Sequence, residues 1–161
     1  MFLLTKCMDP IFKKLNYKEQ AAIMVLNAPE SFALNLEVMK EFTQIFTEQK
    51  GIEKIDFVLA FVTQKAEIET LSAAIFPILE GDALLWVAYP KKSSKNYATD
   101  ISRDSGWQSL GNLGLEPVRM IAIDKDWSAL RFRKVAFIKK LTRRSSMALS
   151  KEGKERTSNK N

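Results

Sequence analysis

The sequence predicts an α/β fold in which a mostly parallel sheet is covered by helices on both faces. Apolar runs of strand length recur along the chain, and amphipathic or polar segments of helix length separate them. Strands that alternate with helices pair in parallel, and right-handed crossovers then place helices on both sides of the sheet. The predicted architecture is therefore a Rossmann-like three-layer sandwich with an antiparallel hairpin at its C-terminal end.

The first elements are a short helix and a buried strand. Asp9 followed by Pro10 is typical of a helix start, because Asp caps free N–H groups and Pro suits the first helical position. The continuous apolar run at residues 21–26 predicts a strand that is buried on both faces.

The segment that follows leaves two structures open. Ser31 is expected to cap a helix. The apolar residues at helical spacing after it are Leu34, Val38, Phe42 and Ile45. Residues 42–47 also alternate as a strand does, so a second strand is the alternative there.

The central part of the chain gives the clearest strand and helix patterns. Apart from Asp56, residues 55–62 are β-branched, aromatic or otherwise apolar, which predicts a strand. Residues 64–79 are amphipathic and predict a helix that Pro77 ends or kinks. Residues 84–88 predict the next buried strand.

The last part predicts a loop, a short helix and a hairpin. After a loop at residues 90–103, Asp104 is expected to cap a helix that reaches Leu110. The strands 118–123 and 128–135 are expected to pair through a polar turn, with the second strand at or near an edge.

The net charge of +6 belongs to the C-terminal end of the chain. Residues 139–161 carry eight basic and two acidic side chains, so the remaining residues are neutral overall. We therefore expect one α/β domain over residues 1–138 and a basic, disordered tail over 139–161. With no long apolar segment and no secretion signal in the sequence, we expect a cytoplasmic protein that spans no membrane.

Composition excludes several chemistries. The chain has no histidine and a single cysteine, Cys7. Cys/His zinc sites, Ser-His-Asp triads and an intramolecular disulfide are therefore excluded within one chain. We expect no metal and no cofactor, and the balance of features favours a protein that is not an enzyme.

The leading candidate site is a lysine cluster after the strand at 84–88. Lys91, Lys92 and Lys95 follow the strand and Pro90 directly, and strand tips are where open α/β sheets bind ligands. These lysines are expected to bind a small anion such as a phosphate or a carboxylate. The hydroxyl groups expected to assist them belong to Ser93, Ser94 and Thr99.

Two further clusters of charged side chains are candidate sites. Asp100 and Asp104, with Arg103 nearby, could hold a metal or act as acid and base, but helix capping and a surface ion pair explain them better. Arg131 and Arg133 share one face of a strand, so they are expected to join the anion site as a guanidinium clamp.

The basic tail carries the fourth candidate site. Its densest basic cluster could contact nucleic-acid phosphates, and the alternative is a tail that only increases solubility. The cluster consists of Lys139, Lys140, Arg143 and Arg144.

Four motifs in order suggest a family. They read Leu-Asn-Ala-Pro at 26–29, Trp-Val-Ala-Tyr-Pro-Lys-Lys at 86–92, Ala-Thr-Asp-Ile at 98–101, and Asp-Lys-Asp-Trp-Ser-Ala-Leu-Arg-Phe at 124–132. On these motifs the chain resembles a bacterial domain-of-unknown-function family that has no established activity. The resemblance implies the Rossmann-like fold and its boundaries, and it implies no reaction.

At the level of the fold, the order of a helix, a strand with the pattern Pro-x-x-x-Gly-x-x-Leu-Leu at 77–85, a helix, a strand and a hairpin is also similar to the second half of class I methyltransferases. In those proteins a glycine-rich turn after the first strand lets the backbone approach the cofactor. The turn here, residues 27–31, has no glycine, and Pro29 removes a donor. This departure counts against binding of S-adenosylmethionine or a dinucleotide.

The sequence therefore favours a small Rossmann-like binding or accessory module that holds an anionic ligand near residues 91–95. Two alternatives stay open. One is a divergent methyltransferase-like enzyme, and the other is a nucleic-acid-associated protein that acts through its basic tail.

Overall fold

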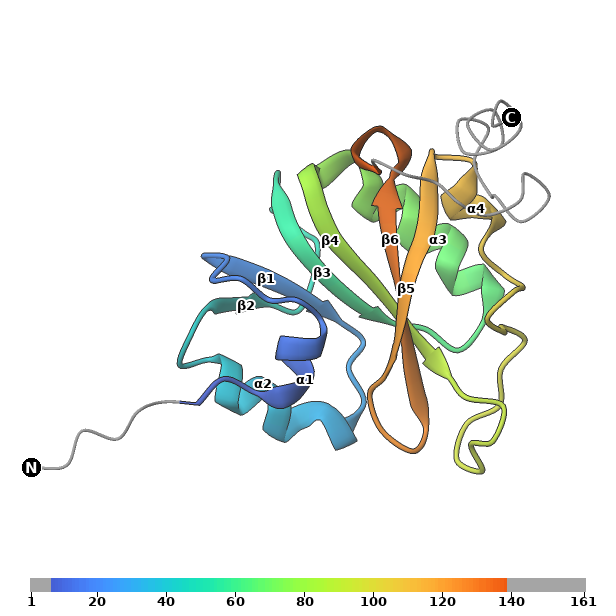
Figure 1. Ribbon diagram of the computed structural model, residues 1–161, viewed down its shortest axis with the longest axis horizontal. Helices are drawn as coiled ribbons and strands as arrows, with labels where there is room; N and C mark the ends of the chain where they lie inside the picture. Colours follow the sequence, from blue (N-terminus) through green and yellow to red (C-terminus); the bar gives the residue numbers. More distant parts are fainter. Residues whose placement is uncertain (1–6, 139–161) are drawn as a thin grey trace, which may run out of the picture.

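The computed structural model describes residues 7–138, in which a six-stranded sheet carries helices on both faces (Figure 1). The strands are β1 (Ala22–Leu26), β2 (Gln44–Phe46), β3 (Ile55–Phe61), β4 (Leu79–Pro90), β5 (Leu115–Ala122) and β6 (Trp127–Lys134). They lie in the order β2-β1-β3-β4-β6-β5. The pairs among β1, β2, β3 and β4 are parallel, and β6 is antiparallel to both β4 and β5. The predicted fold class is confirmed.

Within the described residues, four short α-helices connect or precede the strands. They are α1 (Pro10–Lys14), α2 (Ala33–Met39), α3 (Lys65–Ile75) and α4 (Gln108–Gly111). Single 3₁₀ turns lie at Glu30–Phe32, Phe76–Ile78 and Val135–Phe137. No helix within residues 7–138 is long and apolar enough to cross a membrane. The expected tail at 139–161 lies outside the described residues, as do its basic cluster and its predicted disorder.

Local chemistry explains where the helices begin and end. The Asp9 carboxylate accepts hydrogen bonds from the backbone N–H groups of Ile11 and Phe12 at 2.9 and 3.2 Å, as its capping role predicts. At the start of α3, the Glu67 carboxylate reaches back and accepts a hydrogen bond from the Gln64 backbone N–H at 3.0 Å, as the acidic residue of a capping box does. The helix ends at Ile75, two residues before Pro77, because proline cannot continue the α-helical hydrogen-bond pattern.

One face of the sheet packs against α1 and α2 through aromatic side chains. Phe12 of α1 lies 5.9 Å from Phe57 of β3, measured between ring centroids. The fully buried Trp86 of β4 donates its indole N–H to the Leu15 carbonyl at 2.9 Å, which ties α1 to the centre of the sheet. This layer therefore combines apolar burial with a specific polar contact.

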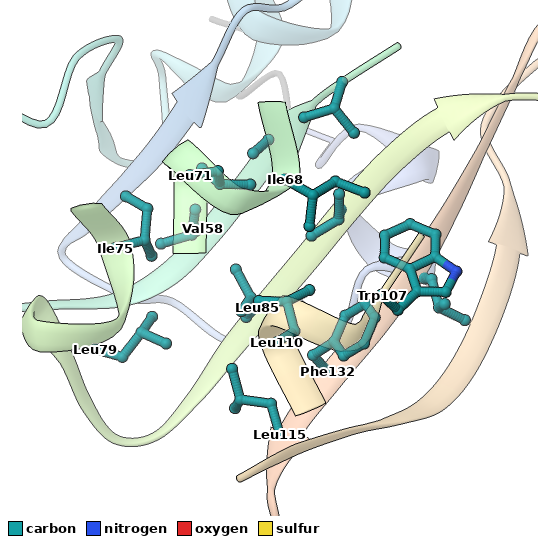
Figure 2. Packing of buried hydrophobic residues seen from close by; sticks show 14 of the residues in the cluster. Val58, Ile68, Leu71, Ile75, Leu79, Leu85, Trp107, Leu110, Leu115 and Phe132 are labelled. Carbon is teal, nitrogen blue, oxygen red and sulfur yellow. The ribbon is translucent and has the colours of Figure 1, made fainter. Parts of the chain in front are cut away.

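The opposite face packs against α3 and α4 and is mostly aliphatic. In Figure 2, Ile68, Leu71 and Ile75 of α3 lie over the sheet near Val58, and Trp107 and Leu110 lie beside Phe132. Side chains of one strand thus meet apolar partners on both faces, which explains why the strand sequences are continuously apolar.

The region of α2 corrects two expectations. Ser31 lies within a 3₁₀ turn, and no side chain caps α2, which begins after Phe32. The side chain of Leu34 is 80% exposed. The α2 residue that is buried in the core is Met39. The helix ends at Met39, and Gln44–Phe46 form an edge strand, so the strand alternative for this segment is confirmed.

The expected cap at Asp104 is also wrong. The helix α4 begins only at Gln108, preceded by Trp107, and no side chain caps it. The buried Trp107 fixes this turn instead, because its indole N–H donates to the Ser102 and Arg103 carbonyls at 2.9 and 3.1 Å. The C-terminal hairpin forms as predicted, with β6 inside the sheet and β5 at its edge.

Candidate functional site

Two clefts open at the carboxyl edge of the parallel strands. The chain runs from β1 outward to β2 and then crosses to β3 on the other side of β1. The carboxyl ends of β1 and β3 therefore form a topological switch point, where open α/β sheets place their ligands. The second cleft lies beyond the end of β4. The segment Thr63–Lys65, which leads into α3, lies between the residues that line the two clefts.

The switch-point cleft has a volume of about 390 Å³. Its apolar walls are Leu26, Val62, Ala66, Leu71, Ala74 and Ile75. Leu26 ends β1, Val62 directly follows β3, and the other four lie along α3. The volume lies in the range of about 300–1,000 Å³ that is typical of small-molecule sites.

The polar groups of the switch-point cleft divide into two kinds. Glu67 accepts hydrogen bonds from the Thr63 and Gln64 backbones and from the Thr63 hydroxyl, and Thr70 donates to the Ala66 carbonyl. The hydrogen bonds of these two side chains stabilise the first turns of α3. Within residues 7–138, the side-chain amides of Asn27 and Gln49 have no hydrogen-bonding partner, so they are free to bind a ligand.

Asn27 also shapes the turn after β1. Its φ of 57° lies in the left-handed region, which glycine usually occupies and which Asn tolerates better than other side chains. The reversal that a glycine would provide is therefore made by Asn27. Sequence reasoning missed this, although an Asn directly after a buried strand was the available signal.

The second cleft is formed by the long segment between β4 and α4, residues 91–107. One end of this loop is fixed by Asp126 in the β5–β6 turn, whose carboxylate accepts from the Ser94 hydroxyl at 2.9 Å and the Asn96 amide at 3.1 Å. The Lys91 backbone N–H donates to the Asp126 carbonyl at 2.7 Å. The hydrogen bonds from Asn96 and Ser94 hold the pKa of Asp126 below its usual value.

The middle of the loop is fixed to the start of α3. The Thr99 hydroxyl donates to the Thr63 carbonyl at 2.5 Å, and the Asp100 carboxylate accepts from the Lys65 N–H at 2.7 Å. Asp100 therefore caps a helix, as the sequence analysis favoured, but the helix is one that precedes it by 35 residues. Ile101, which is 3% exposed, anchors the loop in the aliphatic core.

Glycine is required where this loop passes α3. Gly106 has a φ of 110°, and a Cβ there would lie 3.2 Å from Cγ of Lys65. Both the backbone conformation and the close approach therefore favour a residue without a side chain.

The resulting loop cleft has a volume of about 400 Å³. It is lined by Lys91 and Lys92, by Asp100, and by the hydroxyl-bearing residues Tyr97, Thr99, Ser102 and Ser105, with Ala98 and Ile101 between them. Ser93 and Lys95, which the sequence analysis placed in the anion site, lie on the same loop but do not line the cleft. The hydroxyls of Ser94 and Thr99 already donate hydrogen bonds within the protein, to Asp126 and to the Thr63 carbonyl.

Arg131 and Arg133 lie apart from the lysines. Because β6 runs antiparallel to β4, Arg131 pairs with Trp86, about 17 Å along the strand from Lys91 at ~3.3 Å per residue. Arg133 binds the Asp82 carboxylate through two nitrogens, with Nη2 at 2.6 Å from Oδ2. Burial and the charge of Arg133 lower the pKa of Arg131.

The residue of β6 that reaches the strand tip is Trp127, which pairs with Pro90. It is 3% exposed and packs against Phe61 and Tyr97, with ring centroids 5.1 and 4.8 Å away. Trp127 therefore covers the core at the hairpin end, the structural role that the sequence favoured. No group of three potential metal-ligating side chains gathers within the described part of the chain.

A comparison with protein-family models finds no match for this chain. A comparison with characterised protein sequences also finds none at the significance required. The resemblance to a bacterial family of unknown function therefore stays a prediction, and its four motifs are not confirmed.

Solved structures share the fold. One is a SAM dependent methyltransferase from Aquifex aeolicus, with a TM-score of 0.53 and 13% identity over 78% of this chain and 88% of that one. Another is the pyocyanin biosynthetic protein PhzM, with a TM-score of 0.51 and 10% identity over 81% of this chain and 55% of that one. At such identities the likeness establishes the fold alone, which is a methyltransferase-like Rossmann fold.

Proposed function

We propose that this protein binds a nucleoside-type ligand in the switch-point cleft, and that S-adenosylmethionine is the first candidate. The observation that carries the proposal is the cleft of about 390 Å³ at the carboxyl ends of β1 and β3. Open α/β sheets bind their ligands at this position. The methyltransferase-like fold supports the choice of ligand, and fold likeness by itself assigns no reaction.

The lining of the cleft favours a largely apolar ligand surface with a few hydrogen-bonding groups. No lysine or arginine lines it, and most of its wall is aliphatic. The free amides of Asn27 and Gln49 each offer both a donor and an acceptor. A purine ring and ribose hydroxyls present such groups on a flat, mostly apolar body, so the nucleoside end of S-adenosylmethionine fits this donor set.

The turn after β1 disfavours ligands with phosphate groups. Pro29 lacks the N–H that would bind a phosphate oxygen, and the negatively charged Glu30 begins the 3₁₀ turn that follows. S-adenosylmethionine carries no phosphate, whereas a dinucleotide carries a pyrophosphate. The missing glycines therefore count more strongly against a dinucleotide than against S-adenosylmethionine. When bound, S-adenosylmethionine supplies a methyl group on a sulfonium centre.

Calorimetric titration of the full chain tests this proposal. We expect saturable binding of S-adenosylmethionine and S-adenosylhomocysteine, and much weaker binding of NAD. Ala74→Phe places a ring in the cleft and should weaken binding at least tenfold, which is about 1.4 kcal/mol at 25 °C.

Ala73→Phe is the matched control, because Ala73 is the exposed neighbour of Ala74 on α3 and does not line the cleft. It should leave the affinity within twofold. Absence of binding at millimolar S-adenosylmethionine, or equal losses in the two variants, would contradict the proposal.

A further inference from the structure

We propose that the loop cleft is a second, separate ligand site, which takes a small anion that also carries a hydrogen-bond donor. The anionic group is a phosphate or a carboxylate, held by Lys91 and Lys92. The donor, a hydroxyl or an amine of the same molecule, is held by Asp100. This inference goes beyond the nucleoside site and stands independently of it.

The first support is the length and order of the loop. Loops longer than about 12–15 residues without secondary structure of their own are uncommon and are usually functional. Residues 91–107 contain no helix or strand, yet the loop is tied to Asp126 at one end and to the start of α3 in its middle. The cleft walls are therefore held in place before any ligand arrives, which reduces the entropy lost on binding.

The second support is that the cationic side chains of the cleft have no protein partner. Among residues 7–138, neither Lys91 nor Lys92 forms an ion pair or a side-chain hydrogen bond. The nearby carboxylates have other partners, because Asp126 accepts from Ser94 and Asn96 and one oxygen of Asp100 accepts from Lys65 N–H. Lys91 interacts with the Asp126 carboxylate only through its charge, without a direct contact, so the ammonium groups of Lys91 and Lys92 remain available to hold an anion directly.

The remaining polar groups narrow the class of ligand. The hydroxyls of Ser102 and Ser105 line the cleft and have no partner within the described residues, so they can donate to the same anionic group. The second oxygen of Asp100 has no donor either, and a carboxylate accepts but does not donate. A simple anion would leave this oxygen unused, whereas a hydroxy acid, an amino acid or a sugar phosphate would donate to it.

The arginines that the sequence placed in this site take no part in the proposal. Arg133 is already paired with Asp82, and Arg131 lies several residues away along the strand. Lys95 lies on the same loop outside the cleft lining, which makes it the natural control for the loss of one positive charge.

The test is an NMR titration of the full chain with four probes at low, constant salt concentration. Glycerol 3-phosphate and glycerate carry an anion and a donor, and methyl phosphate and acetate carry the anion alone. We expect saturable shifts of the amides of Lys92, Ser102 and Ser105 with at least one of the first pair. Its affinity should exceed that of its donor-free counterpart at least threefold, and the preferred probe distinguishes phosphate from carboxylate.

Lys91→Ala/Lys92→Ala should weaken that binding at least tenfold, whereas Lys95→Ala should change it less than twofold. Ala74→Phe, which fills the switch-point cleft, should leave it unchanged, so the two sites can fail separately. No saturable binding of any probe at 10 mM, or an equal loss in Lys95→Ala, would overturn the proposal.

Discussion

The two clefts lie on either side of the same helix start, yet they are built in opposite ways. The switch-point cleft is made by the ends of two strands and one face of α3, and most of its wall is aliphatic. The loop cleft is made almost entirely by residues 91–105, and charged and hydroxyl side chains line it. The contrast teaches that regular elements provide the position and the volume of a site here, while a tethered loop provides its charge.

The largest expected effect comes from a substitution that removes the anchor of the loop cleft and leaves the switch-point cleft unchanged. Ile101 is 3% exposed and anchors the loop in the aliphatic core, so Ile101→Ala should lower the free energy of unfolding by about 2–5 kcal/mol. Chemical denaturation of the variant measures this loss. Binding of S-adenosylmethionine to the folded variant should persist, because no residue of the switch-point cleft is changed.

Leu34→Ala is the control for that substitution. Leu34 is 80% exposed, so the same kind of truncation should change the stability by no more than about 0.5 kcal/mol. Equally large losses in the two variants would contradict the exposed position of Leu34, and equally small losses would contradict the buried position of Ile101.

The next effect concerns the switch-point cleft alone. Asn27 has a left-handed backbone, which costs other L-residues roughly 1–2 kcal/mol, so Asn27→Ala should destabilise the protein by about 1 kcal/mol. Asn27→Gly should be close to neutral, because glycine adopts this conformation freely. Urea denaturation of the two variants would disagree with this account if Ala were tolerated as well as Gly.

The smallest expected effect is the pH dependence of the contact between Asp126 and the loop at residues 91–107. The pKa of Asp126 is lower in the folded protein than its ordinary value of 3.8, chiefly through the hydrogen bond from Asn96 and then that from Ser94. A carboxylate with a lowered folded pKa stabilises the fold above its unfolded pKa, and this contribution is lost as the pH falls through the folded pKa.

An NMR titration of the side-chain carboxyl carbons should therefore give Asp126 a midpoint below pH 3.8. In Asn96→Ala the midpoint should move upward, because the strongest lowering interaction is removed. An unchanged midpoint in Asn96→Ala would show that this amide does not hold the carboxylate.

The same contrast explains how much could be predicted from the sequence. The strand β1 and the parts of β3 and β4 at residues 57–61 and 83–90 are recognisable because both of their faces are buried, so their sequences are continuously apolar. The polar start of β4 at residues 80–82 is exposed, and the sequence does not predict it as strand. The position of Lys91 and Lys92 at a strand tip follows directly from Pro90 ending that run. Capping at Asp9 is likewise local, since donor and acceptor lie two or three residues apart.

The remaining features depend on contacts between distant residues. Asp100 meets Lys65 across 35 residues and Thr99 meets Thr63 across 36, and periodicity carries no information about such pairs. The sequence predicts that Arg131 and Arg133 join the lysines because the two arginines share one face of a strand. Their distance from the strand tip depends on the register between β4 and β6, which only the structure provides.

The most direct test of the account is one pair of NMR titrations of the full chain, with S-adenosylmethionine and with glycerol 3-phosphate or glycerate, whichever binds more tightly. The account predicts two separate sets of shifted backbone amides. S-adenosylmethionine should shift those of Asn27, Gln49 and Ala74, and the anion should shift those of Lys92, Ser102 and Ser105. A single shared set, or the absence of any shift around Asn27 with S-adenosylmethionine, would contradict the assignment of two clefts with different ligands.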